Sequence, residues 1–594
     1  MGIDPILRSV VTHRLMTISR KMGESMLRSS RSPIFAEARD FVTAVFDRRL
    51  RLVAQTPYIP VLIGSTPVAV KAIAAHFNDG VTDGDVYVLN DPYRGNNHLP
   101  DVTVVRPVFH RGVLRFWAFT RGHHTDIGGG AGGGYNPAAR TCWEEGLMIP
   151  PSRLYAGGKR CDDLWAMIIN NVRYPLLVEG DLQCKVGATR IGERELTAVL
   201  DTYGPETVEE IIEELLRASE RRVRAEITGM PDGVYRAERR LDCPDREPGG
   251  AIPPTVRLTL TIAGDEMTFD FEGTSAQVPH FVNSPLANTM SACYQAVFTT
   301  LDPDIPFNEG SLSPIRVTAP EGSLVHPTKP APTTYCTVLT AAAIVEAAWL
   351  AISQAVSERT QAAWARSCSG IGSGFNPRTE RPFACIHHFC KGGAGATDGF
   401  DGWDHIGGVI VMGGSRAPDP ELYELTTPHT ILEYQYWPDS GGAGTWRGGH
   451  GIAYRVRFEA DDTTLAVLIG GVAEETAPYG LRGGHPAPKS IVKLHRGNSH
   501  VEEITSTTLC RPRKGDVFQV MYSGGGGYGD PFQRPAGQVR EDVIDGLLSL
   551  GKARAEYGVV LDPGTLAVDE RETQRLRDSG SGQRRRHRDN EDPA

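Results

Sequence analysis

Apolar residues recur at three- and four-residue spacing in several parts of the chain, a pattern typical of amphipathic helices. The first such segment predicts a helix over residues 5–28, whose apolar face carries Leu7, Val11, Leu15, Ile18, Met22 and Met26. A helical region is also expected from residue 152 to residue 227, with helices that begin at Asp162 and at Pro205. Further helices are expected over residues 287–301, 340–356 and 539–557.

Alternation of apolar and polar residues predicts β-strands between these helices. The runs over residues 102–109 and 113–119 are separated by a turn that contains Gly112, so we expect them to pair as a hairpin. Alternation over residues 256–271, interrupted by glycine and aspartate, predicts a second hairpin. Residues 454–469, interrupted by two aspartates, predict a third.

The chain has 594 residues, which is too many for one ordinary hydrophobic core. Its 66 glycines and 41 prolines favour loops and short strands over a helical bundle. We therefore expect a multi-domain α+β protein. Its expected parts are a mixed N-terminal domain (1–228), a β-rich central and C-terminal region with buried helices (229–535), a C-terminal helix (536–562) and a disordered tail (563–594).

The formal net charge of −10 and the pI of about 6.0 argue against nucleic acid or a membrane surface as a partner. The one basic run, RRRHR at residues 584–588, lies in a tail of mixed charge. The longest apolar stretch, LTAAAIVEAAWLA, carries Glu346 and is too short to span a bilayer. No apolar export signal is visible at the N-terminus, so we expect a cytoplasmic protein with ten free cysteines.

The densest group of chemically active side chains lies in two segments, NDPYRGNNHLPDV (90–102) and RGHHTDIGGG (121–130). Imidazole and carboxylate are ligands that suit a divalent ion such as Zn, Mn or Fe. If the hairpin over 102–119 forms, His98, Asp101 and His123 meet at its open end. The same segments are rich in turn-forming residues, and paired histidines are common on protein surfaces, so a purely structural interpretation stays open.

Three other segments invite a functional interpretation. In FAEARDFVTAVFD, Glu37 and Asp40 fall on one side of a predicted helix, for which a solvated face is the alternative. The run SGGGGYGDP (523–531) lacks the Lys-Ser/Thr ending of a phosphate loop, so a structural turn is favoured over nucleotide binding. In CIHHFC (385–390), only His387 shares a strand face with Cys385 and no second half is visible, so packing is favoured over a second metal site.

Several long motifs in the chain resemble, in their order, the hydantoinase B family: NDPYRGNNHLPDVTVV, RGHHTDIGG, EEGLMIPPSRLY, DFEGTSAQV, PDSGGAGTWRGGHG and SGGGGYGDP. The resemblance extends from about residue 4 to residue 561. The family comprises the large subunits of N-methylhydantoinases and caprolactamases and the equivalent subunits of acetone and acetophenone carboxylases. The 5-oxoprolinases carry the same region within one longer chain.

The resemblance implies a hetero-oligomer in which an A-type ATPase subunit of the actin-like class uses ATP to phosphorylate an amide or enol oxygen. The B-type subunit then completes hydrolysis or carboxylation at a divalent transition metal. By motif, the metal ligands would be His98, Asp101 and His123, with Asp40 as the first choice for a fourth ligand and Glu37 as the second.

The neighbouring residues His124 and Asp126 are candidates to orient a ligand imidazole or to act as a base. The loops around them depart from the family pattern at residues 95–98, at Thr125 and after Gly128, which leaves the substrate undefined. The first hypothesis is the subunit of an ATP-dependent hydrolase acting on a hydantoin or lactam. The alternatives are a ketone carboxylase subunit and a non-catalytic scaffold that a metal stabilises.

Overall fold

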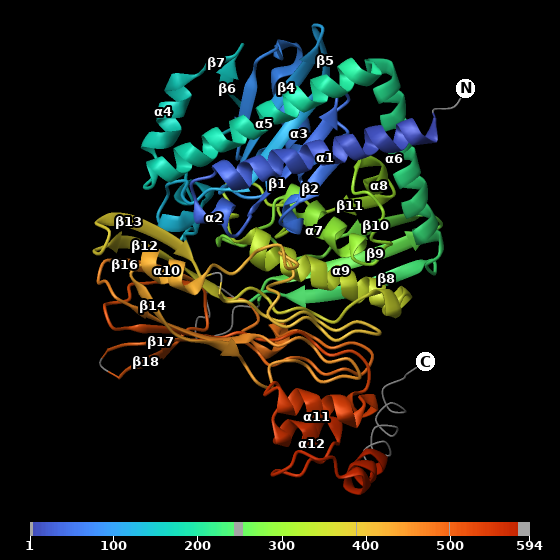
Figure 1. Cartoon of the computed structure of the whole chain (residues 1–594), viewed down its shortest axis with the longest axis vertical. Coiled ribbons are helices and arrows are strands. Elements are labelled where there is room, and N and C mark those ends of the chain that lie inside the picture. The colour runs from blue at the N-terminus through green and yellow to red at the C-terminus, as the bar shows by residue number, and fades with distance from the viewer. Residues whose placement is uncertain (1–3, 243–252, 388, 498, 580–594) are drawn as a thin grey trace.

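The computed structural model describes residues 4–242, 253–387, 389–497 and 499–579 (Figure 1). The predicted α+β class is confirmed, because helices and four separate sheets make up the fold. The predicted division at residues 228 and 535 stays a prediction. The largest apolar cluster contains residues from both sides of the first boundary, such as Val42 and Leu260.

A seven-stranded antiparallel sheet forms the N-terminal part. Its strands, in spatial order, are β2 (Leu52–Pro57), β1 (Phe41–Asp47), β5 (Val113–His123), β4 (Asp101–His110), β3 (Val86–Leu89), β6 (Ser152–Ala156) and β7 (Lys159–Arg160). The hairpin predicted around Gly112 is confirmed as β4–β5. The helical region expected from residue 152 is wrong for its first ten residues, where β6 and β7 pair as the last two strands of the sheet.

Helices cover both faces of this sheet. On one face lie the predicted N-terminal helix α1 (Pro5–Ser29) and the long α5 (Pro175–Tyr203), which cross the strands in Figure 1. On the other face lies α3 (Thr66–Phe77). The remaining helices of this part are α2 (Pro33–Ala36), α4 (Asp162–Asn170) and α6 (Pro205–Thr228), the last of which begins at the predicted proline. Because both faces are covered, β1 is buried along its whole length.

The second sheet contains four strands in the order β11-β10-β9-β8. Their bounds are β8 (Gly233–Arg240), β9 (Thr255–Ala263), β10 (Glu266–Asp270) and β11 (Ile315–Thr318). The second predicted hairpin is confirmed as β9–β10. Packed beside this sheet are α7 (Leu286–Phe298), α8 (Glu309–Leu312) and α9 (Ala341–Ala355), so two of the predicted buried helices are confirmed.

Two further sheets pack face to face in the C-terminal half. One comprises β13 (Arg381–Ile386), β12 (Ser369–Asn376), β16 (Thr463–Leu468) and β19 (Thr508–Cys510). The other comprises β14 (His429–Tyr436), β15 (Ile452–Phe458), β20 (Val517–Met521), β17 (Ile491–His495) and β18 (Val501–Glu503). The third predicted hairpin is therefore wrong: β15 and β16 are strands, but they belong to different sheets. Alternation gives a strand its apolar face and says nothing about its partner.

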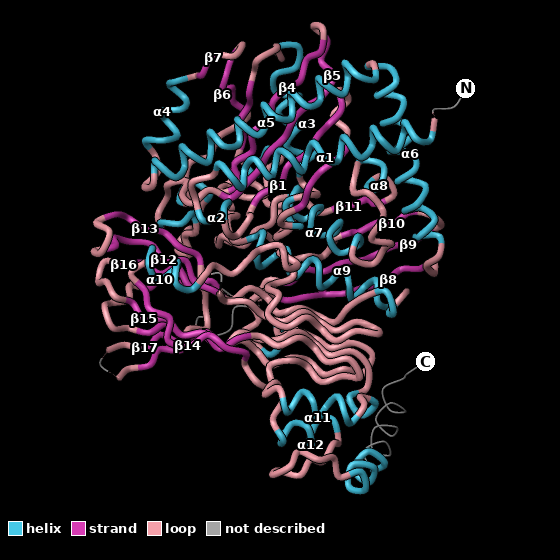
Figure 2. The backbone as a smooth tube through the Cα atoms, viewed as in Figure 1, coloured by secondary structure: helices cyan, strands magenta, loops and turns pink. Residues whose placement is uncertain are grey.

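Glycine-rich segments lie side by side as stacked loops below the second sheet (Figure 2). Gly525 donates its N–H to the carbonyl of Gly449 at 2.9 Å and accepts the N–H of Gly442 at 2.8 Å. A Cβ atom added to Gly525 would lie 1.9 Å from the carbonyl oxygen of Ala394. These segments, which include residues 392–396, 441–451 and 523–529, are here called the glycine stack. They need glycine because their backbones approach too closely for any side chain.

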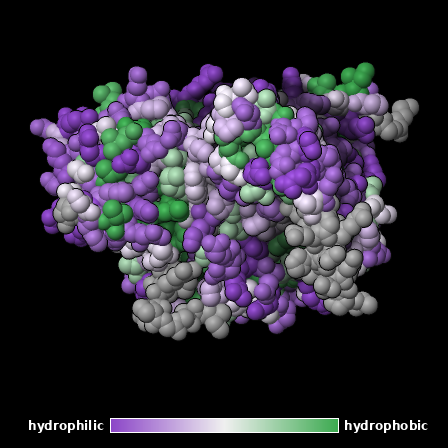
Figure 3. Space-filling model, turned by 90° about the horizontal axis from the view of Figure 1, so that it is seen from below, coloured by the Kyte–Doolittle hydropathy of each residue, from purple (hydrophilic) through white to green (hydrophobic). Residues whose placement is uncertain are grey.

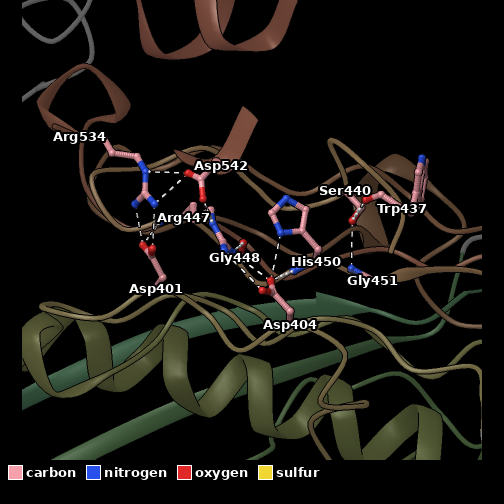
Figure 4. A network of polar contacts seen from close by, with 10 residues as sticks. All are labelled: Asp401, Asp404, Trp437, Ser440, Arg447, Gly448, His450, Gly451, Arg534 and Asp542. Carbon is pink, nitrogen blue, oxygen red and sulfur yellow. Dashed lines mark hydrogen bonds and ion pairs between the residues drawn. The ribbon is translucent and has the colours of Figure 1, made fainter. Parts of the chain in front are cut away.

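Two helices follow the glycine stack, α11 (Ala536–Ile544) and α12 (Leu550–Tyr557). The single helix predicted over 539–557 is wrong, because Gly546 adopts a φ of 72° and ends the first helix. Arginines fix α11 to the loops (Figure 4). Arg447 donates to Asp404 at 3.0 Å and to Asp542 of α11 at 2.9 Å. Arg534 donates to Asp401 at 2.7 Å and to Asp542 at 2.9 Å.

The disordered tail predicted from residue 563 is wrong for its first part. Residues 570–579 form a helix, and the Thr573 hydroxyl accepts the N–H of Val560 at 3.0 Å. Arg577 donates to the carbonyl oxygens of Tyr557 at 3.1 Å and of Arg534 at 2.7 Å. Charged side chains thus satisfy backbone acceptors, although the segment has few apolar residues. Residues 580–594, which include the basic run, lie outside the described residues.

Two helical segments of the described chain, Pro60–Gly80 and Cys336–Ala355, have the length and apolar composition of a membrane span. They are 56% and 83% buried inside the fold, as expected for core helices. Glu346 of the second segment is buried and accepts hydrogen bonds from Arg366 at 2.7 Å and Arg239 at 2.6 Å. The face in Figure 3 is mostly polar, with apolar side chains in separate patches. Nothing in the described part of the chain indicates a membrane protein.

Candidate metal centre

Three neighbouring strands end at the same edge of the seven-stranded sheet and bring the predicted ligands together. In the β4–β5 register, Asp101 lies directly opposite His123. On the other side of β5, the N–H of His123 donates to the carbonyl of Asp40 at 3.0 Å, one position before β1 begins. The hairpin therefore delivers the convergence at its open end that the sequence predicted.

The side chains of His98, Asp101 and His123 point toward one another. Nε2 of His98 lies 3.2 Å from a carboxylate oxygen of Asp101, and Nδ1 of His123 lies 3.7 Å from the other. One potential ligand atom from each of the three residues lies within 4.8 Å of the other two. All three residues are at most 2% exposed. This is an arrangement of donors suitable for a single divalent ion.

The polar atoms of this cluster lack hydrogen-bond donors. Among the described residues, neither carboxylate oxygen of Asp101 has a hydrogen-bond partner, and Nε2 of His123 has none either. Burial raises the pKa of Asp101, but His98 and His123 outweigh it and hold the net pKa below its usual range. A buried carboxylate without hydrogen bonds is costly unless a positive charge compensates it. A bound cation would compensate the charge of this carboxylate beside two imidazole rings, so the residues fit a metal.

Contacts from the central part of the chain fix the orientation of His98. Its Nδ1 lies 2.6 Å from the carbonyl oxygen of Thr334. Because a carbonyl can only accept, this Nδ1 carries a hydrogen, which leaves Nε2, on the side of Asp101, as the nitrogen that could coordinate an ion. Burial lowers the pKa of His98 while Asp101 raises it, and the net shift is upward. No pattern in the sequence signals this contact, since it involves only the backbone of Thr334.

An aromatic side chain that sequence reasoning missed closes the site. The ring of Tyr135 stacks on that of His123, with centroids 5.5 Å apart and planes 19° from parallel. It is buried, and burial followed by the charges of Asp40 and Asp101 raises its pKa well above the usual range. Tyr135 lies in the glycine-rich segment after the second motif, where neither spacing nor alternation marks it.

The structure separates the two candidates for the fourth ligand. Asp40 lies beside the cluster and opens onto a cavity of about 110 Å³. Burial raises its pKa to about 6, with His123 acting in the opposite direction. Glu37 instead opens onto a different cavity of about 270 Å³. Burial, then the charge of Asp419, raises the pKa of Glu37, and the histidines are not among the causes. The predicted helix through both is wrong, because α2 ends before Glu37 and Phe41 begins β1.

The two residues suggested for catalysis have other hydrogen-bond partners. Because successive residues of a strand face opposite sides, His124 points away from the cluster, and its Nε2 lies 2.5 Å from Nζ of the buried Lys185. Asp126 accepts from the guanidinium of Arg173 at 3.0 Å and from its backbone N–H. No hydrogen bond among the described residues joins either to His98, Asp101 or His123. Their catalytic roles stay predictions.

Comparisons with known proteins agree with this architecture. Residues 4–531 match the family model described as hydantoinase B/oxoprolinase. The chain is 35% identical over 579 residues to the beta subunit of the caprolactamase of Pseudomonas jessenii, covering 96% of this chain and 98% of that one. It is 29% identical over 594 residues to the B subunit of a putative D-/L-hydantoinase of Pseudomonas sp. (strain NS671), covering 97% and 98%.

Two solved structures share the fold. The crystal structure of the ATP-dependent caprolactamase from Pseudomonas jessenii superposes with a TM-score of 0.91 and 34% identity, covering 97% of this chain and 100% of that one. The nucleotide-free structure of acetone carboxylase gives a TM-score of 0.90 at 22% identity, covering 100% and 84%. At that identity, the second similarity shows the fold alone.

Proposed function

Since the chain belongs to the hydantoinase B/oxoprolinase family, we propose that it is the catalytic subunit of an ATP-dependent enzyme that hydrolyses a cyclic amide. The substrate class is a hydantoin or lactam. The observation that carries the proposal is the buried cluster of His98, Asp101 and His123, whose carboxylate has no hydrogen-bond partner in the part of the chain that the structure describes.

In this proposal, His98, Asp101 and His123 hold a divalent transition metal of the Zn, Mn or Fe class, with Asp40 as the fourth donor. An ion bound there would polarise the amide carbonyl and lower the pKa of a bound water. Thr334 orients His98, and Tyr135 fixes the ring of His123 by stacking on it. Asp40 faces the cavity, which places it between the cluster and an entering substrate.

ATP use is assigned to a partner, an A-type ATPase subunit. The related caprolactamase chain is named as a subunit, and the crystal structure of that enzyme is described as ATP-dependent. Within this chain, the run at residues 523–529 packs its backbone against other backbone segments. A phosphate loop would instead leave its N–H groups free for a ligand.

A ketone carboxylase subunit is the second candidate, favoured by the shared fold with acetone carboxylase. The chain co-purified with its A-type partner would be assayed with ATP on lactams, hydantoins and ketones, with and without bicarbonate. Amide hydrolysis that needs no bicarbonate supports the proposal. ATP-dependent ketone consumption that requires bicarbonate, without any amide hydrolysis, overturns it in favour of the carboxylase.

A non-catalytic scaffold is the third candidate, and His123→Ala tests it. Loss of metal and turnover with an unchanged circular dichroism spectrum and melting temperature supports a catalytic metal. The control is His110→Ala at the opposite end of the same hairpin, where a buried histidine pairs with Asp201 at 2.9 Å. If metal depletion lowers the melting temperature of wild type but leaves its turnover intact, the metal is structural.

A further inference from the structure

We propose that Cys385, His387 and His429, together with the hydroxyl of Tyr423, form a second binding site for a divalent metal of the zinc class. Nδ1 of His429 lies 2.8 Å from the Tyr423 oxygen and 3.9 Å from Sγ of Cys385. The Tyr423 oxygen lies 3.2 Å from Nδ1 of His387 and 3.7 Å from the Cys385 sulfur. One ligand atom from each of Cys385, His387 and His429 lies within 4.8 Å of the other two.

These separations match the edges of a tetrahedral coordination shell. Zinc bonds of about 2.0 Å to nitrogen or oxygen and about 2.3 Å to sulfur give edges of about 3.3 Å and about 3.6 Å. Four of the six edges, at 2.8, 3.2, 3.7 and 3.9 Å, lie on both sides of these values. The other two join His387 to Cys385 and to His429, whose ligand atoms lie within 4.8 Å of one another. Side-chain movements that bring the four donors to tetrahedral separations would complete the shell.

The fold assembles these donors from three separate elements. Cys385 lies on β13 and His387 directly after it, so both face the same side of the sheet. His429 opens β14 in the facing sheet, and Tyr423 lies on the short helix α10 (Pro420–Thr426). The sequence suggested a half-site at CIHHFC but offered no second half, because His429 and Tyr423 come from another sheet and a helix. His388 of that motif lies outside the described residues.

A glycine on the neighbouring strand leaves the room that the cluster occupies. Gly372 of β12 pairs with Cys385. A Cβ atom added there would lie 3.2 Å from the Cys385 sulfur, 3.4 Å from Cε1 of His429 and 3.7 Å from Nε2 of His387. The alternate glycines of SGIGSG (369–374) thus keep this face of β12 free of side chains where the donors gather.

Binding of a metal would require the Cys385 thiol to lose its proton. Burial, then the neighbouring His387, lowers the pKa of His429 well below its usual range, so the ring is neutral and able to coordinate. Burial raises the pKa of the Cys385 thiol to about 12. Metal binding would displace the thiol proton to solvent as the sulfur–metal bond forms, so affinity falls as the pH falls.

The two sites differ in donor chemistry and in role. The cluster at Asp101 contains no sulfur, whereas the second site offers a thiolate, which favours zinc over manganese. With four protein donors it leaves no open position, as in structural zinc sites. We assign it the role of fixing α10 to β13 and β14. His387 also lines the cavity onto which Asp40 opens, so the second site supports one wall of the proposed active site.

The test uses the full-length chain loaded with zinc or with Co(II). Wild type should bind two ions per chain, and the cobalt form should show a thiolate-to-cobalt charge-transfer band. Cys385→Ser should lose one ion and the band. Asp101→Asn should lose the other ion and keep the band, which separates this proposal from the proposed function. The matched control is Cys510→Ser, a buried cysteine of β19 outside the cluster, which should keep both ions and the band.

Wild type that shows no thiolate band and binds no metal beyond the Asp101 site would overturn the proposal. The four side chains would then be a hydrogen-bond network centred on the Tyr423 hydroxyl. Because this readout uses wild type, it holds even if Cys385→Ser fails to fold. Tyr423→Phe should bind the second ion at least tenfold more weakly. Unchanged affinity would overturn the assignment of its oxygen as the fourth donor.

Discussion

The edge of the seven-stranded sheet and the glycine stack are the two most motif-dense parts of the chain, and they use their residues in opposite ways. At the sheet edge, His98, Asp101 and His123 contribute donor atoms to a buried cluster. In the glycine stack, Gly525 and its neighbours contribute the absence of a side chain, so that backbones pack at hydrogen-bond distance.

The density of a motif therefore does not by itself show whether the segment binds a ligand. Both segments invite a ligand-binding interpretation, one for metal and one for nucleotide. The cluster at the sheet edge leaves polar atoms without hydrogen bonds among the described residues, and a bound ion would compensate the carboxylate there. In the glycine stack, backbone N–H groups such as those of Gly525, Gly526 and Gly527 already donate to carbonyl oxygens of the protein. A cluster of ligand-type side chains around a carboxylate without hydrogen bonds favours a bound ion, whereas backbone groups that are satisfied by other backbone favour a packing role.

The largest effect on activity is expected from Asp101→Asn. The change is nearly isosteric but replaces a charged oxygen donor with a neutral amide, which binds a divalent ion far more weakly. We expect most of the metal to be lost, turnover to fall at least about 100-fold and circular dichroism to be unchanged. The control is Asp85→Asn, a buried aspartate of the same sheet that accepts several protein hydrogen bonds. Full metal content and turnover in Asp101→Asn would show that it is a turn residue.

The largest effect on stability is expected in the glycine stack, from Gly525→Ala. The new Cβ would lie 1.9 Å from the carbonyl of Ala394, and backbone cannot rotate away as a side chain can. We expect a loss of about 3 kcal/mol or more in the free energy of unfolding, measured by urea denaturation. Gly537→Ala, in α11 with nothing within 4 Å of the new atom, should change stability by less than about 1 kcal/mol in either direction. Equal effects in the two variants would refute close backbone packing as the reason for these glycines.

A smaller effect at the sheet edge separates Asp40 from Glu37. Asp40→Asn should weaken metal affinity about 10- to 100-fold, because the carboxylate lies among the histidines and Asp101. Glu37→Gln should leave affinity unchanged, because that carboxylate faces another cavity. Competition with a chelator measures both. If only Glu37→Gln weakens binding, the fourth donor is Glu37.

The sheet edge should also respond to pH in a way that the glycine stack does not. Burial lowers the pKa of Lys185 from 10.5 to about 7, so the folded state disfavours the ammonium. The penalty is fully present below pH 7, fades as the pH rises and is absent above pH 10.5. Lys185→Met should therefore be most favourable relative to wild type at pH 7 and below, and lose most of that advantage by pH 10. For Gly525→Ala, whose effect is steric, the difference from wild type should be the same at both pH values. If the difference in stability between Lys185→Met and wild type does not change with pH, burial does not lower the pKa of this amine.

Sequence predicted what local geometry determines. The β4–β5 hairpin and the meeting of Asp101 with His123 followed from alternation, a glycine turn and residues that lie near each other in the chain. The helix α1 followed from apolar spacing, and the start of α6 followed from Pro205. In these features, the residues that contact one another lie close together in the sequence, so a local pattern is enough to predict the contact.

What depends on distant partners could not be predicted in this way. The strands β15 and β16 follow one another in sequence, yet they pair in different sheets. Thr334 reaches His98 through its backbone, which carries no residue-specific signal. Asp40 was placed on a helix because its spacing fits one, whereas it lies directly before β1, which pairs with β5. In each case tertiary contacts override local propensity.

The smallest effects are expected at the C-terminus, where two truncations separate a packed segment from the charged run. Ending the chain after residue 569 removes the hydrogen bonds that Thr573 and Arg577 make with the loops around α12. Their net contribution is about 1 to 2 kcal/mol, so the melting temperature should fall slightly while turnover is retained, because these contacts lie far along the chain from Asp101. Ending the chain after residue 579 removes the sequence GSGQRRRHRDNEDPA, which has almost no apolar surface to bury. This second truncation should match the full chain in melting temperature and turnover. Equal melting temperatures for both truncations would mean that the helix over 570–579 adds nothing to stability. A loss of turnover in the chain that ends after residue 579 would show that the basic run has a function that its composition does not suggest.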